Sequence, residues 1–336
     1  MIKNYKFTCG ALFSGIGGFC IGFEEEGFKT LWASDFDAQV AETYRLNFPE
    51  SRFLHADIAS IDFDDLEPVD VLHAGFPCQS FSQAGNRLGF DDPRGQLFNV
   101  LMDKIAAASW KPKVLVLENS PFIKAGGNGE WFAHIKYRIK KSGFWFDNQN
   151  ALEVSTHEHA GLPQKRERLF MVATDKNFFG FNPFSQVSKT TSFKKNTDIL
   201  ELSAVHDEKY YLSKNNRYGK WILSEGTKLK DGQLLQLRKN VLRPQEVDIC
   251  PTLTANMGLG GHNVPFLVQE KRLRKMTERE CLRMQGFPDS FSFPQMPSSA
   301  KYRMIGNSVS PPVASRIANQ IMEELLAQSE YLARSA

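Results

Sequence analysis

A cysteine at the end of an apolar run is the residue in this sequence best placed to do chemistry. Cys78 follows Gly75-Phe76-Pro77, which itself comes directly after the apolar stretch 69–74. Pro77 lacks an amide hydrogen and holds its φ angle near one value, so the predicted strand ends there and Cys78 sits on a rigid turn. A thiol at the carboxyl end of such a strand is a candidate nucleophile. The commoner alternative for a single cysteine is a small buried hydrophobe.

Acidic residues end three further short runs that we predict to be strands. Asp35, Asp57 and Glu118 each come directly after such a run. The carboxyl ends of parallel strands meet at one edge of a sheet, so we expect these acids and Cys78 to form one site. Each acid taken alone is more often a helix cap or a solvated loop residue.

A glycine-rich turn follows the first predicted strand, Phe7–Phe13. The turn reads Ser14-Gly15-Ile16-Gly17-Gly18 and brings backbone amides close to a ligand at the start of the next helix. Asp35 comes seventeen residues after Gly18, where a ribose-binding acid belongs in a nucleotide site. The spacing differs from the dinucleotide fingerprint because Cys20 stands in the place of the third glycine, and an ordinary structural turn is the alternative.

The composition is that of an ordinary soluble globular protein with length for one large domain or two. The chain has 336 residues, of which 42% are hydrophobic and 24% charged. It contains no apolar run long enough to cross a bilayer, and Met1–Lys6 lacks the apolar core of a signal peptide, so we expect a cytoplasmic protein without membrane contact. The five cysteines are scattered, which predicts reduced thiols and no structural metal.

Positive charge is concentrated in one part of the chain. Residues 189–245 contain twelve Lys or Arg and six Asp or Glu, whereas the whole chain has a net charge of only +3. A basic segment on a nearly neutral body suits a polyanionic partner such as nucleic acid. The alternative is a solvated polar insertion.

Five sequence motifs in order give the chain a family resemblance. They are Phe13-Ser14-Gly15-Ile16-Gly17-Gly18, Gly75-Phe76-Pro77-Cys78-Gln79, Glu118-Asn119, Gln164-Lys165-Arg166-Glu167-Arg168 and Gly306-Asn307-Ser308-Val309. This series resembles that of the DNA (cytosine-5)-methyltransferases and covers nearly the whole chain. The size is similar to that of the compact bacterial modification enzymes of restriction-modification systems.

The resemblance implies a covalent mechanism. Carbon 5 of cytosine is a poor nucleophile until a thiolate adds to carbon 6, and Cys78 matches the family's nucleophile. Glu118 would meet ring nitrogen 3 in protonated form, which requires a raised pKa. The family's arginines map to Arg166 and Arg168, with Arg168 contacting the ring's carbonyl oxygen; phosphate contact or a surface ion pair is the alternative for both.

The resemblance also implies S-adenosyl-L-methionine as the methyl donor. Phe13 and Phe36 would flank its adenine, Asp35 would bind the ribose, Asp57 would meet the adenine edge, and the glycine turn would approach the methionine end. The expected cofactor-binding residues are Phe13, Ser14, Gly15, Ile16, Gly17, Gly18, Asp35, Phe36, Asp57, Pro77, Asn307, Ser308 and Val309.

Duplex DNA is the implied partner, and base flipping the implied route of the target cytosine to Cys78. The turn-rich segment Ser80–Leu97 suits a loop that closes over DNA, and the glycine-rich segment Pro251–Asn263 resembles a recognition loop for the major groove. The expected DNA-binding residues are Gln79, Ser82, Arg94, Thr252, Thr254, Asn256, Gly260, Gly261 and His262.

The expected architecture is a Rossmann-like α/β methyltransferase fold with a mostly parallel sheet and a smaller, irregular target-recognition domain. We assign 1–177 to the catalytic domain, 178–290 to target recognition, and 291–336 to a segment that packs back on the catalytic domain. Its helix, roughly Val313–Leu332, would lie beside the first helix. One catalytic set per chain suggests a monomer, and a cognate restriction endonuclease would act on the same site without stable contact.

The chain departs from the family pattern at Ser120, where valine is usual, and the added hydroxyl needs a local hydrogen bond. Three other functions remain open at this point. One is methylation of transfer RNA, which the basic, aromatic segment disfavours. Another is a non-catalytic DNA-binding relative, against which Cys78, Glu118 and Arg168 argue. The last is a nicotinamide dehydrogenase, which only the glycine turn suggests.

Overall fold

The structure is a computed structural model that describes residues 5–81, 88–183, 186–215, 217–225, 229–238, 241–245, 248–257 and 264–335. The chain divides into two compact units. Unit 1 comprises Met1–Val154, Glu167–Ser188 and Pro311–Ala336, and unit 2 comprises Ser155–Arg166 and Lys189–Ser310. This division rests on compactness and does not show which unit binds DNA, so the functional domain ranges given above stay a prediction.

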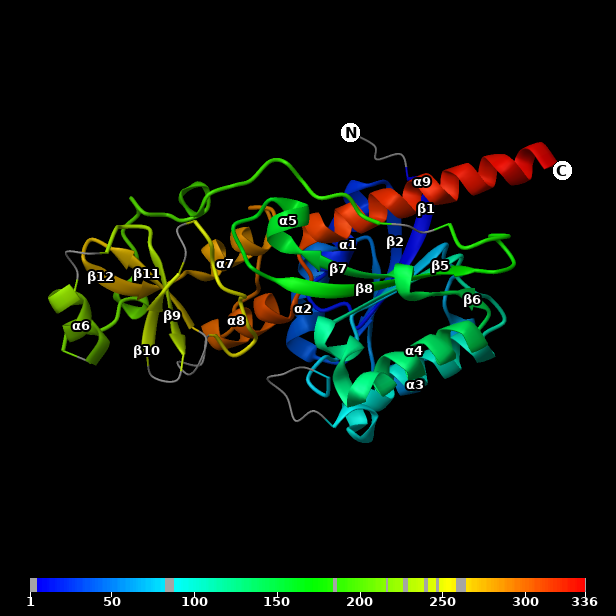
Figure 1. Ribbon diagram of the computed structural model, residues 1–336, viewed down its shortest axis with the longest axis horizontal. Coiled ribbons are helices and arrows are strands. Elements are labelled where there is room, and N and C mark those ends of the chain that lie inside the picture. The colour runs from blue at the N-terminus through cyan, green and yellow to red at the C-terminus, as the bar shows by residue number, and fades with distance from the viewer. Residues whose placement is uncertain are drawn as a thin grey trace. The chain divides into compact units, whose positions relative to one another are not determined.

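Unit 1 is built on a mostly parallel sheet. Its strands run in the order β3-β2-β1-β4-β5-β8-β6, with β7 also paired to β8 (Figure 1). Their bounds are β1 Phe7–Leu12, β2 Phe28–Asp35, β3 Arg52–His55, β4 Val71–Ala74, β5 Val114–Asn119, β6 Phe144–Trp145, β7 Ala151–Ser155 and β8 Glu167–Asp175. Strands β1 to β5 pair in parallel, whereas β8 is antiparallel to β5 and β6. The strand order reverses between β1 and β4, which is where open α/β sheets bind ligands.

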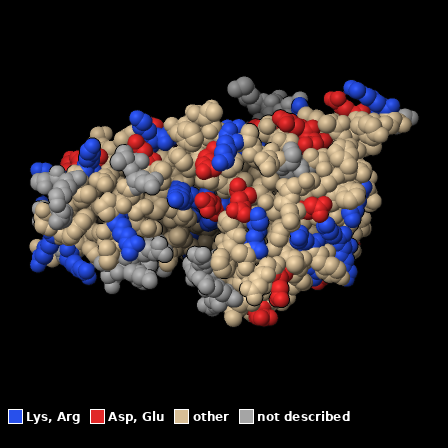
Figure 2. Space-filling view, viewed as in Figure 1, with Lys and Arg blue, Asp and Glu red and all other residues tan. Residues whose placement is uncertain are grey.

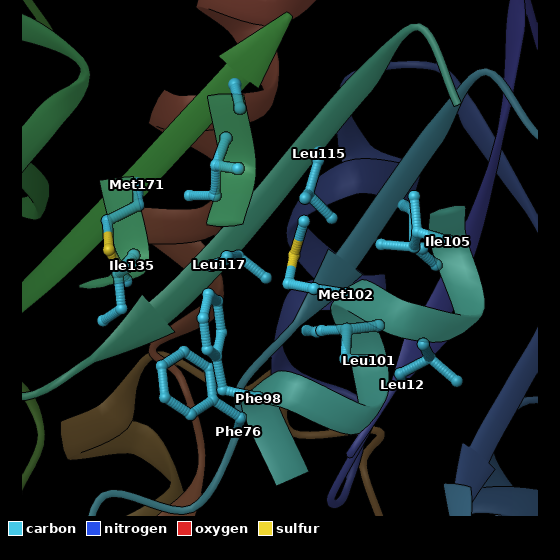
Figure 3. Packing of buried hydrophobic residues seen from close by; sticks show 14 of the residues in the cluster. Leu12, Phe76, Phe98, Leu101, Met102, Ile105, Leu115, Leu117, Ile135 and Met171 are labelled. Atoms are coloured by element: carbon cyan, nitrogen blue, oxygen red, sulfur yellow. The ribbon is translucent and has the colours of Figure 1, made fainter. Parts of the chain in front are cut away.

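Helices cover both faces of this sheet (Figure 1). Their bounds are α1 Gly18–Glu25, α2 Ala38–Asn47, α3 Pro93–Ala107, α4 Glu130–Lys141 and α9 Pro311–Ser335. A large apolar cluster lies between the sheet and α3 and α4, and Figure 3 shows Phe98 of α3 beside Phe76 in it. A smaller cluster that includes Cys20 and Tyr44 lies under α1 and α2 on the other face. Both faces are therefore buried, as the apolar sequences of the central strands require.

The C-terminal helix returns to the first helix, as predicted. A side chain at Gly22 of α1 would meet the carbonyl oxygen of Pro311 and the amide of Ser315, both in α9. Ser315 Oγ also donates to Glu26 Oε1 at 2.5 Å. The contact is close because Gly22 has no side chain, and it joins the two ends of the sequence within unit 1.

Unit 2 contains a second sheet, which is antiparallel. Its order is β10-β9-β11-β12, with bounds β9 Leu234–Arg238, β10 Val241–Pro244, β11 Val264–Gln269 and β12 Arg272–Lys275. Its helices include α5 Thr156–Ala160, α6 Arg217–Glu225, α7 Glu278–Gln285 and α8 Ser298–Asn307. The sequence predicts an irregular domain here, because these short strands lie among Gly, Asn and Lys residues that hide the alternation of apolar and polar side chains.

No described helix is both long and apolar enough to span a membrane. The same residues contain no group of three or more His, Cys, Asp or Glu side chains that could hold a metal ion.

A buried histidine lies in the middle of β4. His73 has an exposure of 0% and stacks on Phe19 of α1 with ring centroids 4.7 Å apart. Among the described residues, neither of its ring nitrogens has a hydrogen-bond partner. Burial lowers the pKa of His73 to about 3, so the folded protein keeps the imidazole neutral in mildly acidic solution.

We predict that His73 makes unit 1 less stable as the pH falls. Below the usual histidine pKa of about 6.5 the unfolded chain binds a proton that the folded chain refuses, so acid favours unfolding. Between about pH 7.5 and pH 5 this costs roughly 2 kcal/mol in the free energy of unfolding. His73→Leu removes that part of the pH dependence in urea unfolding curves. Identical pH slopes for the two proteins would contradict the prediction.

Candidate active site

Cys78 lies on a turn that is held by apolar packing and by hydrogen bonds to its backbone. The turn follows β4, and its Phe76 side chain is 1% exposed within the apolar cluster. Asn119 at the end of β5 donates its Nδ2 hydrogen to the Phe76 carbonyl oxygen at 3.1 Å. The amide of Phe81 donates to the Cys78 carbonyl oxygen at 3.0 Å and closes the turn. Cys78 is the one cysteine of the five that is not buried.

Glu118 and Arg168 meet beside this turn. Glu118 is the last residue but one of β5, which pairs in parallel with β4, and a side chain at Gly75 would come within 3.5 Å of Glu118 Oε2. Arg168 lies on β8, antiparallel to β5, and its Nε is 3.0 Å from Glu118 Oε1. The Arg168 side chain is 23% exposed and that of Glu118 12%, so the pair is partly exposed, and its attraction is stronger than that of a fully exposed pair. The predicted nucleophile turn, acid and arginine thus lie at the same sheet edge.

The Ser120 hydroxyl, unusual for the family resemblance, has a local partner. Its Oγ accepts a hydrogen bond from the amide of Phe122 at 3.4 Å and caps a short helical turn, Pro121–Lys124. The hydroxyl is thus satisfied within the first turn after β5.

Arg166 has a different environment from Arg168. It belongs to unit 2 and is 2% exposed. Its Nη1 donates to Leu253 O at 2.9 Å, and its Nη2 donates to Gly306 O at 3.0 Å and Ser308 O at 2.7 Å. These three hydrogen bonds use three of the five N–H donors of the guanidinium and join three chain segments of unit 2. The catalytic role expected for Arg166 stays a prediction.

A pocket at the carboxyl ends of β1, β2 and β3 contains the residues expected to bind the adenosine part of the cofactor. It is lined by Leu12, Phe13, Ser34, Asp35, Phe36, Ala56, Asp57, Ile58 and Leu97. Phe36 is 68% exposed, which leaves its ring free of the core and available to a ligand. Leu97, from α3, was not predicted, because a single leucine in a helical run carries no signal for a ligand.

Asp35 fixes the glycine turn at the edge of this pocket. Its Oδ2 accepts from the amide of Gly15 at 3.0 Å and its Oδ1 from the amide of Asp37 at 3.1 Å. Burial raises the pKa of Asp35, and these backbone hydrogen bonds oppose the shift. Each carboxylate oxygen has a second lone-pair site, so the side chain can still accept from a ligand hydroxyl. Asp57 Oδ1 accepts from the amide of Ala59 at 2.8 Å.

The glycine turn has room for a ligand on one side only. A side chain at Gly15 would meet nothing within 4 Å, whereas one at Gly17, with φ of 85°, would overlap the ring of Phe48. Ser14 Oγ is buried and has no hydrogen-bond partner among the described residues. Open space beside backbone amides and the Ser14 hydroxyl fits the polar methionine end of S-adenosyl-L-methionine.

The remaining predicted cofactor residues are less informative. Ile16 is 1% exposed and packs into the core, Gly18 begins α1, and Pro77 is half-buried in the nucleophile turn. Asn307, Ser308 and Val309 belong to unit 2, so their expected approach to the cofactor stays a prediction.

The predicted DNA-binding residues that the structure describes belong to both units. Gln79 is exposed, while Arg94 is held in a fork by Asp92, with Nη2 2.7 Å from Oδ2. Arg94 lowers the pKa of Asp92 through hydrogen bonds. In unit 2, Thr252 Oγ1 donates to Lys165 O at 2.5 Å, and Thr254 Oγ1 donates to Asn256 Oδ1 at 2.7 Å. Ser82, Gly260, Gly261 and His262 lie outside the described residues.

Two polar residues that hydrogen-bond to the backbone of other segments were not among the predicted site residues. Asn119 holds the nucleophile turn, and its place in the Glu118-Asn119 motif could have revealed it. Gln164 donates to Met284 O at 2.9 Å and accepts from the amide of Leu253 at 3.3 Å, beside Arg166. Its partners are about ninety residues or more away along the chain, so no local pattern could identify it.

The fold is that of known methyltransferases. The chain superimposes on the Dnmt2 methyltransferase of S. pombe with a TM-score of 0.71 at 21% identity, covering 95% of this chain and 99% of that one. The Entamoeba histolytica methyltransferase EhMeth gives a TM-score of 0.69 at 19% identity, with 95% and 99% covered. At these identities the similarity establishes the fold.

The chain belongs to the C-5 cytosine-specific DNA methylase family, whose model matches residues 7–323. It is 36% identical over 320 residues to the Type II methyltransferase M.Bsp6I of Bacillus sp. (strain RFL6), covering 94% of this chain and 98% of that protein. It is also 32% identical over 339 residues to the Type II methyltransferase M.HpaII of Haemophilus parainfluenzae, with 95% and 90% covered. The chain is a DNA cytosine-5-methyltransferase.

We predict that replacing Arg166 mainly lowers stability, whereas replacing Arg168 mainly lowers activity. Arg166→Ala should lower the free energy of unfolding by about 3 to 5 kcal/mol, because three buried carbonyl oxygens lose their donor. Arg168→Ala, at a partly exposed pair, should cost less than about 1 kcal/mol of stability but slow methyl transfer about 100-fold. Urea unfolding and initial rates measure both quantities. A stable but inactive Arg166→Ala protein would contradict this prediction and indicate a catalytic role for Arg166.

Proposed function

We propose that this enzyme transfers a methyl group from S-adenosyl-L-methionine to carbon 5 of a flipped-out cytosine within a specific duplex DNA sequence, through a covalent Cys78 adduct. The observation that supports this most directly is the arrangement of Cys78, Glu118 and Arg168 at one sheet edge, on strands next to the pocket that begins at β1. The proposal rests on the family and on the chemical fit of these residues.

Cys78 is the proposed nucleophile. Its thiolate adds to carbon 6 of the cytosine ring, and the displaced ring electrons move toward nitrogen 3. Glu118 brings a proton to nitrogen 3, and Arg168 orients the Glu118 carboxyl group and faces the ring's carbonyl oxygen. Carbon 5 is then electron-rich enough to accept a methyl group. A water molecule then accepts the proton from carbon 5, and the electrons of that C–H bond expel the Cys78 thiolate. Glu118 takes back the proton on nitrogen 3, which restores the aromatic ring.

Asp35 and its neighbours are proposed to hold the methyl donor, which supplies an electrophilic methyl group on a sulfonium. Phe13 and Phe36 would flank the adenine, Asp57 would meet its edge, and Asp35 would accept from the ribose hydroxyls. The amide of Gly15 is already fixed by Asp35, so ribose binding and the shape of the glycine turn depend on the same carboxylate.

Duplex DNA is the proposed substrate, and unit 2 the proposed reader of its sequence. The whole basic segment 189–245 belongs to this unit, and Lys and Arg side chains are scattered over the face that carries α6 and β9–β12 in Figure 2. Phosphates attract such side chains without regard to sequence, while base edges in the major groove give the specificity. A duplex base cannot reach Cys78 unless it leaves the stack.

The proposed biological role is in a restriction-modification system, which similarity to relatives named Type II methyltransferases supports. There the enzyme would protect host DNA from an endonuclease that cuts the same sequence, and the two proteins need no stable contact.

Covalent trapping tests the proposed reaction. Mixed-sequence duplexes that carry 5-fluorocytosine are incubated with the enzyme and S-adenosyl-L-methionine, because fluorine at carbon 5 blocks release of the thiolate. We expect a shifted band on denaturing gels that Cys78→Ser abolishes, while cofactor affinity measured by calorimetry stays within about twofold. Trapping of the enzyme by transfer RNA and not by DNA would show that the substrate is transfer RNA. An active Cys78→Ser enzyme would refute the mechanism.

Asp35→Ala should weaken binding of S-adenosyl-L-methionine about 10- to 100-fold, because the ribose loses an acceptor and the glycine turn loses its anchor. Asp62→Ala is the matched control, since Asp62 caps a short helical turn of unit 1 outside the pocket. Calorimetric titration measures both affinities. Equal losses in the two variants would show that Asp35 acts only on folding.

A further inference from the structure

Trp131 packs directly on backbone at three glycines from two different segments. A side chain at Gly89 or Gly126 would overlap its indole, and one at Gly127 would come within 2.7 Å of its Nε1. Trp131 lies in the first turn of α4, and Gly126 and Gly127 lie in the turn before it. Gly89 belongs to a distant stretch, Gly89–Asp91, that precedes α3. The indole therefore fills space that only glycine leaves open.

The same indole contacts the other side of the nucleophile turn. The Phe81 ring lies 5.4 Å from the Trp131 ring in an edge-to-face arrangement, and Phe81 is 0% exposed. The Phe81 amide is bound to the carbonyl oxygen of Cys78. Phe81 thus contacts both the Cys78 turn, through its amide, and Trp131, through its ring.

Phe81 and Gly89 are held to each other as well as to Trp131. The Gly89 amide donates to Ser80 O at 3.0 Å, and the rings of Phe81 and Phe90 lie 5.1 Å apart. A side chain at Gly95 in α3 would in turn overlap the Gly89 carbonyl oxygen. The two stretches that lead away from Cys78 and back into α3 therefore meet at one indole.

We propose that Trp131 is a positioning residue for the nucleophile: its indole fixes Phe81 and Gly89 together and so limits the positions available to the Cys78 thiol. The inference rests on the proposed role of Cys78. Trp131 is not proposed to touch the reacting atoms, and the cofactor residues Asp35 and Asp57 accept hydrogen bonds from Gly15 and Ala59, which belong to other segments. A small misplacement of a reacting group is enough to cost a large part of the rate.

The test compares Trp131→Ala, Trp131→Phe, Gly89→Ala and the double variant Trp131→Ala/Gly89→Ala. The rate of covalent trapping on 5-fluorocytosine duplex at saturating cofactor should fall about 10- to 100-fold in Trp131→Ala and less in Trp131→Phe, with cofactor affinity within about twofold of the parent. Gly89→Ala should slow the parent more than it slows Trp131→Ala, because the added methyl group clashes with the indole.

A second measurement does not depend on DNA. Cys78 is the one cysteine of the five that is not buried, so its alkylation by iodoacetamide, followed by mass spectrometry, reports directly on the thiol. Trp131→Ala should raise this alkylation rate at least threefold. Faster alkylation without trapping in any protein, the parent included, would leave the Trp131 proposal standing and defeat the proposed reaction.

Ile139→Ala is the control for a general loss of stability, because Ile139 is fully buried in the same helix two turns further on. It should lower the unfolding temperature without changing the trapping or alkylation rate by more than about twofold. The proposal is overturned if Ile139→Ala slows trapping as much as Trp131→Ala, or if Trp131→Ala keeps the parent's trapping and alkylation rates. If Trp131→Ala does not fold, Trp131→Phe and Gly89→Ala decide by the same two rates.

Discussion

The parallel pairing of β1, β4 and β5 is the constraint on which the active site depends. Parallel strands have their carboxyl ends at one edge, so residues that follow each strand meet although they are far apart in sequence. The glycine turn follows β1, Cys78 follows β4 and Glu118 lies at the carboxyl end of β5, next to its last residue. Antiparallel β8 then brings Arg168 to the same edge from the opposite direction, where it pairs with Glu118.

Contacts to backbone make this edge precise. Asn119 binds the carbonyl oxygen of Phe76, Asp35 binds the amide of Gly15, and the Trp131 indole lies on the α-carbon side of Gly89. Each contact fixes a turn rather than another side chain. Turns carry chemistry well only when a rigid scaffold limits their motion, and these three residues supply that limit.

Unit 2 depends instead on buried polar groups. Arg274 and Glu280 form a fully buried bidentate pair with both contacts at 2.7 Å, and Glu280 also completes a capping box with Thr277 at the start of α7. Burial alone raises the pKa of Glu280, but the hydrogen bonds and charge of Arg274 outweigh burial and lower it. Arg166 and Gln164 extend this pattern to the segments around Leu253 and Met284. Directional hydrogen bonds between buried polar groups thereby fix the positions of the short elements of unit 2.

The sequence by itself determined the class of the fold and the main chemical groups. Apolar runs that end in Asp35, Cys78 and Glu118 predict a parallel sheet with its site at one edge, because burial on both faces leaves only strand ends free for polar residues. The tertiary structure decided what each arginine does: Arg166 and Arg168 stand two residues apart, yet Arg166 is enclosed by carbonyl oxygens and Arg168 meets Glu118. It also decided the place of Trp131 and the antiparallel sheet of unit 2. These features rest on contacts between residues distant in sequence, which leave no local pattern to read.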